Sequence, residues 1–155
     1  MDASRQFRRC LGKFATGVTV VTCRDADDRP CGITANSFSS VSLSPPLVLW
    51  NIAKVSRSLQ AYLSADYFAI NILTRHQQAI ARRFARSVDN LFQNIDFDNS
   101  ERNVPLLQET LAHFECRTHD IHDCGDHHII IGEVTDFHLS AGEPLIFYSG
   151  EYTEL

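Results

Sequence analysis

The run THDIHDCGDHH, residues 118–128, gathers four histidines, three aspartates and one cysteine in a short stretch of chain. Imidazole, thiolate and carboxylate groups are the ligands that zinc prefers. A metal site built from His119, His122, Cys124 and His127 is therefore one interpretation. Its geometry is unfavourable, because His119 lies on the strand before the turn and the others lie around or beyond it. Too few ligands then converge, so no bound metal is expected.

A second unusual segment is GITANSFSSVSLSPPLV, residues 32–48, in which small and hydroxyl-bearing side chains dominate and charges are absent. Such a segment brings the backbone close to a ligand and offers amide and hydroxyl donors. A planar heterocycle with carbonyl and ring-nitrogen acceptors would suit it. The alternative is a strand and turn with solvated Ser and Thr, and composition alone favours that alternative.

Two further groups are candidates for binding an anion. Ser56 and Ser58 precede a short helix, where unpaired backbone N–H groups point outward and can bind phosphate. Ordinary capping of that helix is the alternative. Arg82, Arg83 and Arg86 follow on a second helix, and Arg82 and Arg86 are four residues apart, which puts them on one face. They either meet a phosphate or form a solvated face.

Composition narrows the classes of function. The 155 residues carry a net charge of -5, so the chain lacks the basic face that binding nucleic acid requires. No apolar run approaches the roughly 20 residues that span a bilayer, and no secretory signal is visible. Five cysteines without a CxxC pair fit free thiols in a reducing cytoplasm. We expect one cytoplasmic domain, residues 1–155, with no membrane or nucleic-acid partner.

Hydrophobic patterning predicts a mainly β protein. Nearly continuous apolar runs at 47–53 and 67–73 are typical of strands buried on both faces. Helical spacing of apolar residues predicts short helices at 56–64 and 74–87, the second beginning at Thr74. Residues 87–105 look irregular. With further strands at 17–23, 111–121, 127–139 and 144–152, the pattern predicts a closed or partly closed β-barrel with a few short helices.

Common catalytic signatures are absent: the chain has no GxSxG elbow, no P-loop and no GxGxxG. The order and spacing of other segments resemble the short-chain flavin reductase family, the reductase components of two-component flavin monooxygenases. These segments are FATGVTVVT, GITANSFSSVSLSPPLV, FAINIL followed by IARRFA, CGDHHIIIGEV and PLIFYSGEY. The resemblance runs from about residue 7 to residue 152, nearly the whole chain.

The resemblance implies an FMN-binding split β-barrel that works as a homodimer and binds FMN or FAD at the subunit interface. It implies oxidation of NADH or NADPH, transfer of the hydride to flavin, and release of reduced flavin to a separate oxygenase. The isoalloxazine ring would be lined by Thr34, Ala35, Asn36 and Ser37. The flavin phosphate would be held by Ser56 and Ser58, with help from the helix that carries Arg82, Arg83 and Phe84.

In the same resemblance, Gly125, Asp126 and His127 match the family's GDH turn, whose histidine faces the nicotinamide. His127 is then the catalytic residue of the opening run, and the other histidines are incidental. His128, the next residue along the strand, should point to the opposite face. One departure is the stretch before PLL, which usually carries glycines but here reads DNSERNV; the conformation of residues 94–104 is therefore left open.

Two alternatives share the fold. One is a flavin- or haem-binding split-barrel protein without turnover, in which histidines of residues 119–128 would be axial ligands to haem. The other is an enzyme like pyridoxamine-phosphate oxidase, which would need a more basic phosphate pocket. The GDH turn followed by IIIGEV favours the reductase over both.

Overall fold

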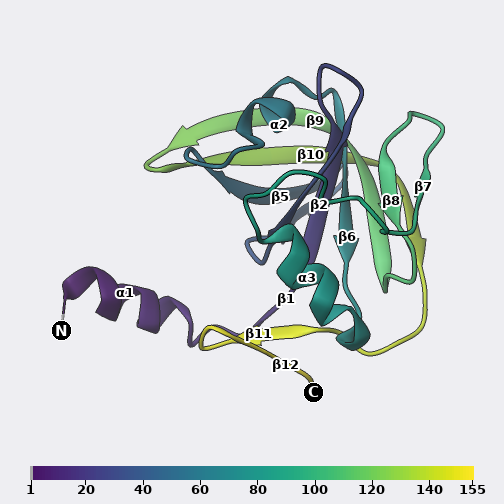
Figure 1. Cartoon of the computed structure of the whole chain (residues 1–155). Coiled ribbons are helices and arrows are strands. Elements are labelled where there is room, and N and C mark those ends of the chain that lie inside the picture. The colour runs from purple at the N-terminus through teal and green to yellow at the C-terminus, as the bar shows by residue number, and fades with distance from the viewer. Residues whose placement is uncertain (1) are drawn as a thin grey trace.

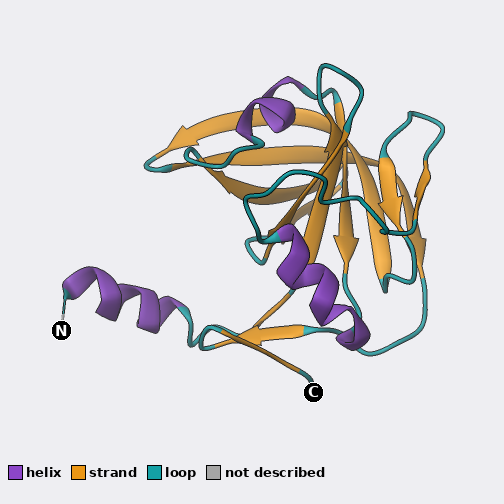
Figure 2. Ribbon diagram, viewed as in Figure 1, coloured by secondary structure: helices purple, strands orange, loops and turns teal. Residues whose placement is uncertain are grey.

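The computed structural model describes residues 2–155, and most of its strands form one curved antiparallel sheet (Figures 1 and 2). The strand order is β3-β2-β6-β9-β10-β5-β4. The bounds are β2 (Thr19–Arg24), β3 (Pro30–Ala35), β4 (Ser39–Leu43), β5 (Pro46–Ala53), β6 (Tyr67–Ile72), β9 (Ala112–Cys124) and β10 (His127–Leu139). Because β3 and β4 remain as edges, the barrel is open on one side. The predicted partly closed barrel with a few short helices is confirmed.

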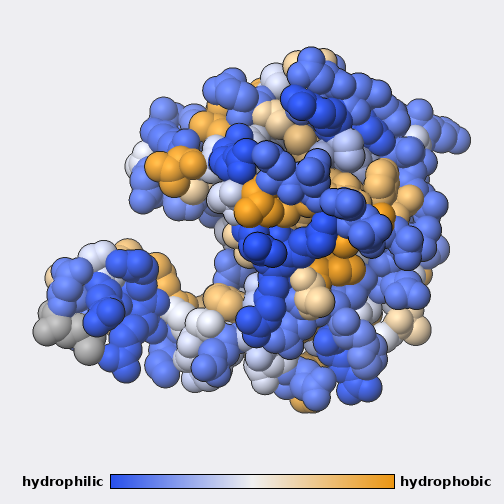
Figure 3. Space-filling view, viewed as in Figure 1, coloured by the Kyte–Doolittle hydropathy of each residue, from blue (hydrophilic) through white to orange (hydrophobic). Residues whose placement is uncertain are grey.

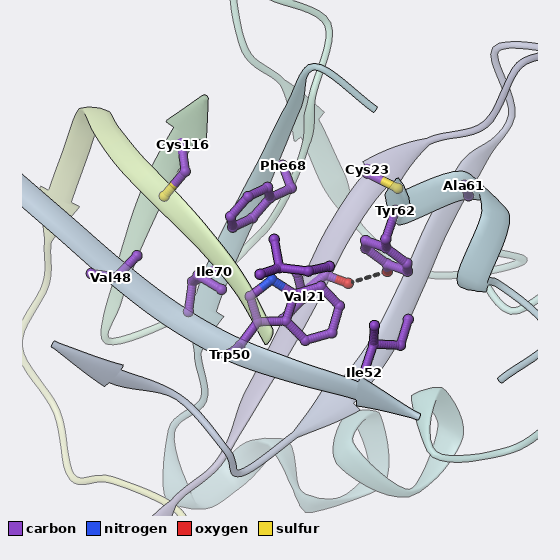
Figure 4. Packing of buried hydrophobic residues seen from close by; sticks show 11 residues of the cluster. Val21, Cys23, Val48, Trp50, Ile52, Ala61, Tyr62, Phe68, Ile70 and Cys116 are labelled. Atoms are coloured by element: carbon purple, nitrogen blue, oxygen red, sulfur yellow. Dashed lines mark hydrogen bonds between the residues drawn. The ribbon is translucent and has the colours of Figure 1, made fainter. Parts of the chain in front are cut away.

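The core of the barrel is filled from alternate positions of these strands. On β5, Val48, Trp50 and Ile52 are buried while their neighbours are only partly covered, so the strand turns one face to the core. The prediction of burial on both faces is therefore wrong for β5, whereas β6 is buried on both faces. The Trp50 ring meets the Tyr62 ring edge-on at 5.0 Å, and Tyr62 donates its hydroxyl hydrogen to the Val21 carbonyl at 2.6 Å (Figure 4). Tyr62 belongs to α2 (Leu59–Ser64), so these contacts fix that helix over the barrel.

A second apolar cluster lies beneath α3 (Gln78–Phe84) and includes Val18, Val20, Leu73 and Phe84. The preceding 3-10 helix, η1 (Arg75–Gln77), has Thr74 as its N-cap residue. Thr74 and the Gln77 side chain form a reciprocal capping box, which confirms the predicted helix start. The helix ends at Phe84, earlier than the predicted residue 87.

Two small sheets complete the fold. β1 (Thr16–Gly17), β11 (Ile146–Tyr148) and β12 (Glu151–Thr153) form one, and β7 (Phe97–Asn99) pairs with β8 (Pro105–Leu107) in the other. The β7–β8 hairpin lies largely in the stretch predicted to be irregular, which corrects that prediction. Tertiary hydrogen bonds hold it: Thr22 donates its hydroxyl hydrogen to the Pro105 carbonyl at 2.5 Å, and the Asn71 side chain accepts from the Leu107 N–H at 3.0 Å.

The helix α1 (Ala3–Leu11) buries none of its residues and lies apart from the barrel (Figures 1 and 3). Asp2 caps it by accepting a hydrogen bond from the Ser4 N–H at 3.3 Å. Phe7 and Leu11, four residues apart on one face of the helix, are exposed, and so is Phe14 in the turn that follows it. Within residues 2–155, no helix has both the length and the apolar character needed to cross a membrane.

Candidate active site

A cavity of about 1100 Å³ opens between β3, the start of α2 and the loop 85–93 that follows α3. Its lining includes three of the predicted cofactor-binding residues, Ser56, Ser58 and Phe84. In the space-filling view, hydrophobic surface is exposed among hydrophilic residues on the side of the molecule between α2 and α3 (Figure 3). A nucleotide-sized ligand with a flat apolar ring and a charged end fits a cavity of this kind.

The two serines face one another at the start of α2. Their Oγ atoms are 3.2 Å apart, and the Ser58 N–H donates to Ser56 Oγ at 3.4 Å. Ser58 is the N-cap residue of α2, yet its side chain makes no capping hydrogen bond. Simple capping by Ser58 is therefore not what the structure shows. Both hydroxyls remain available to a ligand in the cavity.

The arginines occupy positions that differ from the prediction. Arg82 lies over the Tyr152 ring, 5.5 Å from its centroid. Arg83 donates its Nε hydrogen to the Leu91 carbonyl at 2.5 Å and also bonds the carbonyls of Asn90 and Gln93. Neither lines the cavity, whereas Arg86 does. Arg83 thus shapes the loop that forms one wall, and Arg86 is the arginine of this group that a ligand would meet.

Residues that sequence reasoning missed also line the cavity. Arg57 forms an ion pair with Asp89 at 2.6 Å and donates to the Ser87 carbonyl at 2.9 Å. These contacts connect the segment that precedes α2 to the loop 85–93 on the other side of the cavity. The position of Arg57 between two serines in KVSRSLQ was the available signal.

Gly32 has a steric role at the same wall. A Cβ atom at Gly32 would lie 2.7 Å from the Phe84 ring, so only glycine lets that ring pack against β3. Phe84 is buried, and its ring meets the Phe92 ring edge-on at 5.0 Å. The wall on this side of the cavity is therefore aromatic.

The predicted isoalloxazine segment continues β3 beyond the cavity wall without itself lining the cavity. Thr34 donates its hydroxyl hydrogen to the Ala81 carbonyl at 2.6 Å, and the Ala35 carbonyl accepts from the Thr19 hydroxyl at 2.6 Å. Asn36 is exposed, and Ser37 Oγ accepts a hydrogen bond from the Asn51 N–H at 3.0 Å. The segment is held in place at both ends, as a binding strand requires.

The GDH turn joins β9 to β10, with Gly125 at a φ of 59° that favours glycine. His127 Nδ1 lies 2.7 Å from Asp126 Oδ1, and this contact holds the pKa of Asp126 below its usual value. The His127 side chain is 45% exposed. The Asp126 carbonyl accepts from the Lys54 N–H at 2.9 Å, and Lys54 also pairs with Asp123. The turn is thereby tied to the loop that carries Ser56.

The remaining histidines of the run have separate neighbours. His119 lies 3.8 Å from Glu133, and His122 lies 3.0 Å from Asp120. Across residues 2–155, no group of three His, Cys, Asp or Glu side chains is close enough to hold a metal ion. His128 pairs with Ile52 while His127 pairs with Ala53, so the two neighbouring side chains lie on opposite faces.

Residues 11–155 match the family described as "Flavin reductase like domain". The chain belongs to the flavin reductase family. It is 46% identical to FMN reductase (NADH) SmoA of Agrobacterium fabrum, over 97% of this chain and 86% of that protein. It is also 46% identical to a probable flavin reductase of Rhizobium meliloti, but covers 48% of that longer protein.

A solved structure agrees along the whole fold. The NADH:FAD oxidoreductase SgcE6 of Streptomyces globisporus, in complex with NAD and FAD fragments, superposes with a TM-score of 0.94 at 39% identity, over 99% of this chain and 93% of that one. These relatives confirm the predicted activity: the chain is an NAD(P)H:flavin oxidoreductase.

Proposed function

We propose that this flavin reductase holds its flavin with the phosphate at Ser56 and Ser58 and the ring against residues 34–37, and takes hydride from NADH held near His127. The observation that carries the proposal is the serine pair: two adjacent hydroxyls line a nucleotide-sized cavity, and the Ser58 hydroxyl makes no capping hydrogen bond. Reduced flavin then serves a separate oxygenase, as the names of reductase subunits among the relatives indicate.

Charge supports the phosphate position. Arg86 lines the cavity and forms no ion pair with any residue of the described part of the chain, 2–155. Arg57 lies nearby, although its charge is already paired with Asp89. A hydrogen bond to a charged group contributes about 1.5–3 kcal/mol, so two hydroxyls and one guanidinium form a strong phosphate site.

The ring position is supported by an unpaired acceptor. The side-chain oxygen of Asn51 is buried and has no hydrogen-bond partner within residues 2–155, and its backbone is bonded to Ser37. A buried polar atom without a partner costs about 1–3 kcal/mol. The imide N–H of an isoalloxazine ring is a donor of the kind that would remove this cost.

A bound flavin supplies the hydride acceptor. The chain contributes alignment, because hydride transfer needs the two rings stacked with reacting atoms about 3–3.5 Å apart. Asp126 holds His127 through Nδ1, which leaves Nε2 as the ring nitrogen that meets the nucleotide. Backbone amides of residues 34–37 are suited to stabilise negative charge on the reduced ring.

We also propose a homodimer in which α1 packs on the second copy. Phe7 and Leu11 of α1 are 64% and 57% exposed, and Phe14 just after the helix is 79% exposed, an arrangement that costs solubility unless another surface covers these side chains. We further propose a cytoplasmic location, because all five cysteines are free thiols, which fits a reducing compartment.

Sedimentation equilibrium is expected to give roughly twice the 17.5 kDa chain mass. Changing Phe7 and Leu11 together to serine removes most of the apolar surface that α1 would bury on the second copy, so the variant should shift toward the monomer mass. As a control, Arg5 and Arg8 on the same helix are changed together to serine, and this variant should remain a dimer. A native protein that sediments as a monomer and still reduces flavin would disprove the interface.

The proposed function is tested by mixing the purified protein with NADH and adding FMN, FAD or riboflavin in turn. NADH absorbance should fall only when flavin is present, and NADPH should be oxidised more slowly, as the relatives named for NADH suggest. A protein that shows a haem absorbance band and no flavin-dependent oxidation of NADH would instead support the haem-binding alternative.

A further inference from the structure

Two cysteines lie directly opposite one another in the wall of the cavity. β2 and β3 pair in a register that places Cys23 against Cys31, so both side chains project from the same face of the sheet. Directly opposed residues of antiparallel strands have Cα atoms about 4.5–5.5 Å apart. A disulfide needs about 4.4–6.8 Å, so this pair can be bridged without moving either strand far.

The two thiols have unequal surroundings. Cys23 is fully buried beside Tyr62 and Ala61, as Figure 4 shows, whereas Cys31 is half-buried and lines the cavity. Hydrogen bonding from Cys23 lowers the pKa of Cys31, with help from the nearby charge of Arg29. The same contact, together with burial, raises the pKa of Cys23 far above its ordinary value. The Cys31 thiol, which faces the cavity, therefore ionises more readily than the buried Cys23 thiol.

We infer that Cys23 and Cys31 form a peroxide-reactive dithiol, a modification site next to the proposed flavin position. The source of oxidant rests on the flavin reductase function. Reduced flavin that meets dioxygen gives oxidised flavin and hydrogen peroxide, a small molecule that can diffuse into the cavity that Cys31 borders. The thiolate of a cysteine in contact with solvent and stabilised by a neighbour is the form that attacks peroxide.

The chemistry balances in two steps. The Cys31 thiolate attacks one peroxide oxygen, the O–O bond breaks, and hydroxide leaves, which makes a sulfenic acid on Cys31. Cys23 sulfur then attacks the Cys31 sulfur, and its proton leaves with the hydroxyl group as water. The hydroxide takes up the proton that Cys31 released when it ionised, so two thiols are oxidised, one peroxide is reduced to two waters, and a disulfide joins β2 to β3.

The other three cysteines lack this arrangement. Cys10 and Cys124 are exposed, and β-pairing sets Cys124 against His127 rather than another thiol. Cys116 is buried at the opposite side of the core cluster from Cys23, and burial raises its pKa to about 12 (Figure 4). The Cys23–Cys31 bridge would close only the short loop 24–30, so it gains little from loop entropy and should be readily reduced.

The test uses the full chain, first reduced with dithiothreitol and shown to oxidise NADH with added FMN. A stoichiometric addition of hydrogen peroxide should lower the free thiols of the denatured protein from five to three. Trypsin cuts after Arg24 but not before Pro30, so the disulfide should join peptides 14–24 and 25–54 in the mass spectrum, about 2 Da below their sum. Dithiothreitol should separate them again.

Matched variants locate the chemistry. Cys10→Ser/Cys124→Ser should still form the link, whereas Cys31→Ser should not. Turnover of NADH and FMN in air should produce the same link without added peroxide, and catalase should prevent it. Oxidation confined to Cys10 or Cys124, or absence of the joined peptides after added peroxide, would overturn the dithiol even in a fully active reductase. A link that forms in turnover despite catalase would overturn peroxide as the oxidant.

Discussion

Replacing His127 with alanine is expected to lower kcat/KM for NADH by at least about tenfold, because a nucleotide ring misplaced by about 1 Å can cost on the order of a hundredfold in rate. The Kd for flavin should stay within about threefold of the parent value. Asp126 fixes the imidazole by its Nδ1 atom, so the side chain presents a defined ring edge to the nucleotide. The measurement is steady-state NADH oxidation at saturating flavin, with flavin affinity determined separately by fluorescence quenching.

His122→Ala is the matched control for this variant. His122 lies on the same β9–β10 hairpin, pairs in register with Ile129 and so shares a face with His127, and is comparably exposed. It should leave the kinetic constants near those of the parent. An equal loss in both variants, together with activity abolished by EDTA and restored by zinc, would favour the metal interpretation of this histidine-rich run.

Much of the fold followed from sequence because burial leaves a strong pattern. The runs 47–53 and 67–73 are apolar on both faces, and they became β5 and β6 nearly residue for residue. α1 was not predicted, since a helix that buries nothing in its own chain has no apolar face set by a core. The β7–β8 hairpin was also missed, because hydrogen bonds from distant residues such as Thr22 and Asn71 hold it, rather than local patterning.

In the candidate site, too, features set by local sequence could be predicted, whereas features set by distant contacts could not. Ser56 and Ser58 both line the cavity, because local chain geometry at the start of α2 places them together, and their role at the flavin phosphate stays a prediction. For the arginines, what proved wrong is the shared helical face of Arg82 and Arg86, which required the helix to continue to residue 87. α3 ends at Phe84, so Arg86 leaves the helical face that it would have shared with Arg82 and turns to the cavity. The end of α3 depends on the following loop, which Arg83 holds through hydrogen bonds to backbone carbonyls. The spacing of apolar residues along the sequence does not reveal such contacts.

Changing Ser56 and Ser58 together to alanine is expected to weaken FMN binding by at least about tenfold, because each hydroxyl bonded to a charged phosphate contributes about 1.5–3 kcal/mol and about 1.4 kcal/mol corresponds to tenfold in affinity. Riboflavin, which has no phosphate, should bind nearly as it does to the parent. Calorimetric or fluorescence titration of each ligand into both proteins gives the comparison.

Ser64→Ala provides the control for this double change, since Ser64 lies on the same helix and its hydroxyl donates to the Gln60 carbonyl at 2.7 Å instead of facing the cavity. It should leave both affinities unchanged. The double variant loses one long backbone contact, from the Ser58 N–H to Ser56 Oγ at 3.4 Å, and no capping bond of Ser58, so its fold and thermal midpoint should stay close to the parent's. Equal losses for FMN and riboflavin would place the phosphate elsewhere, and Arg86 alone would then be the group to test.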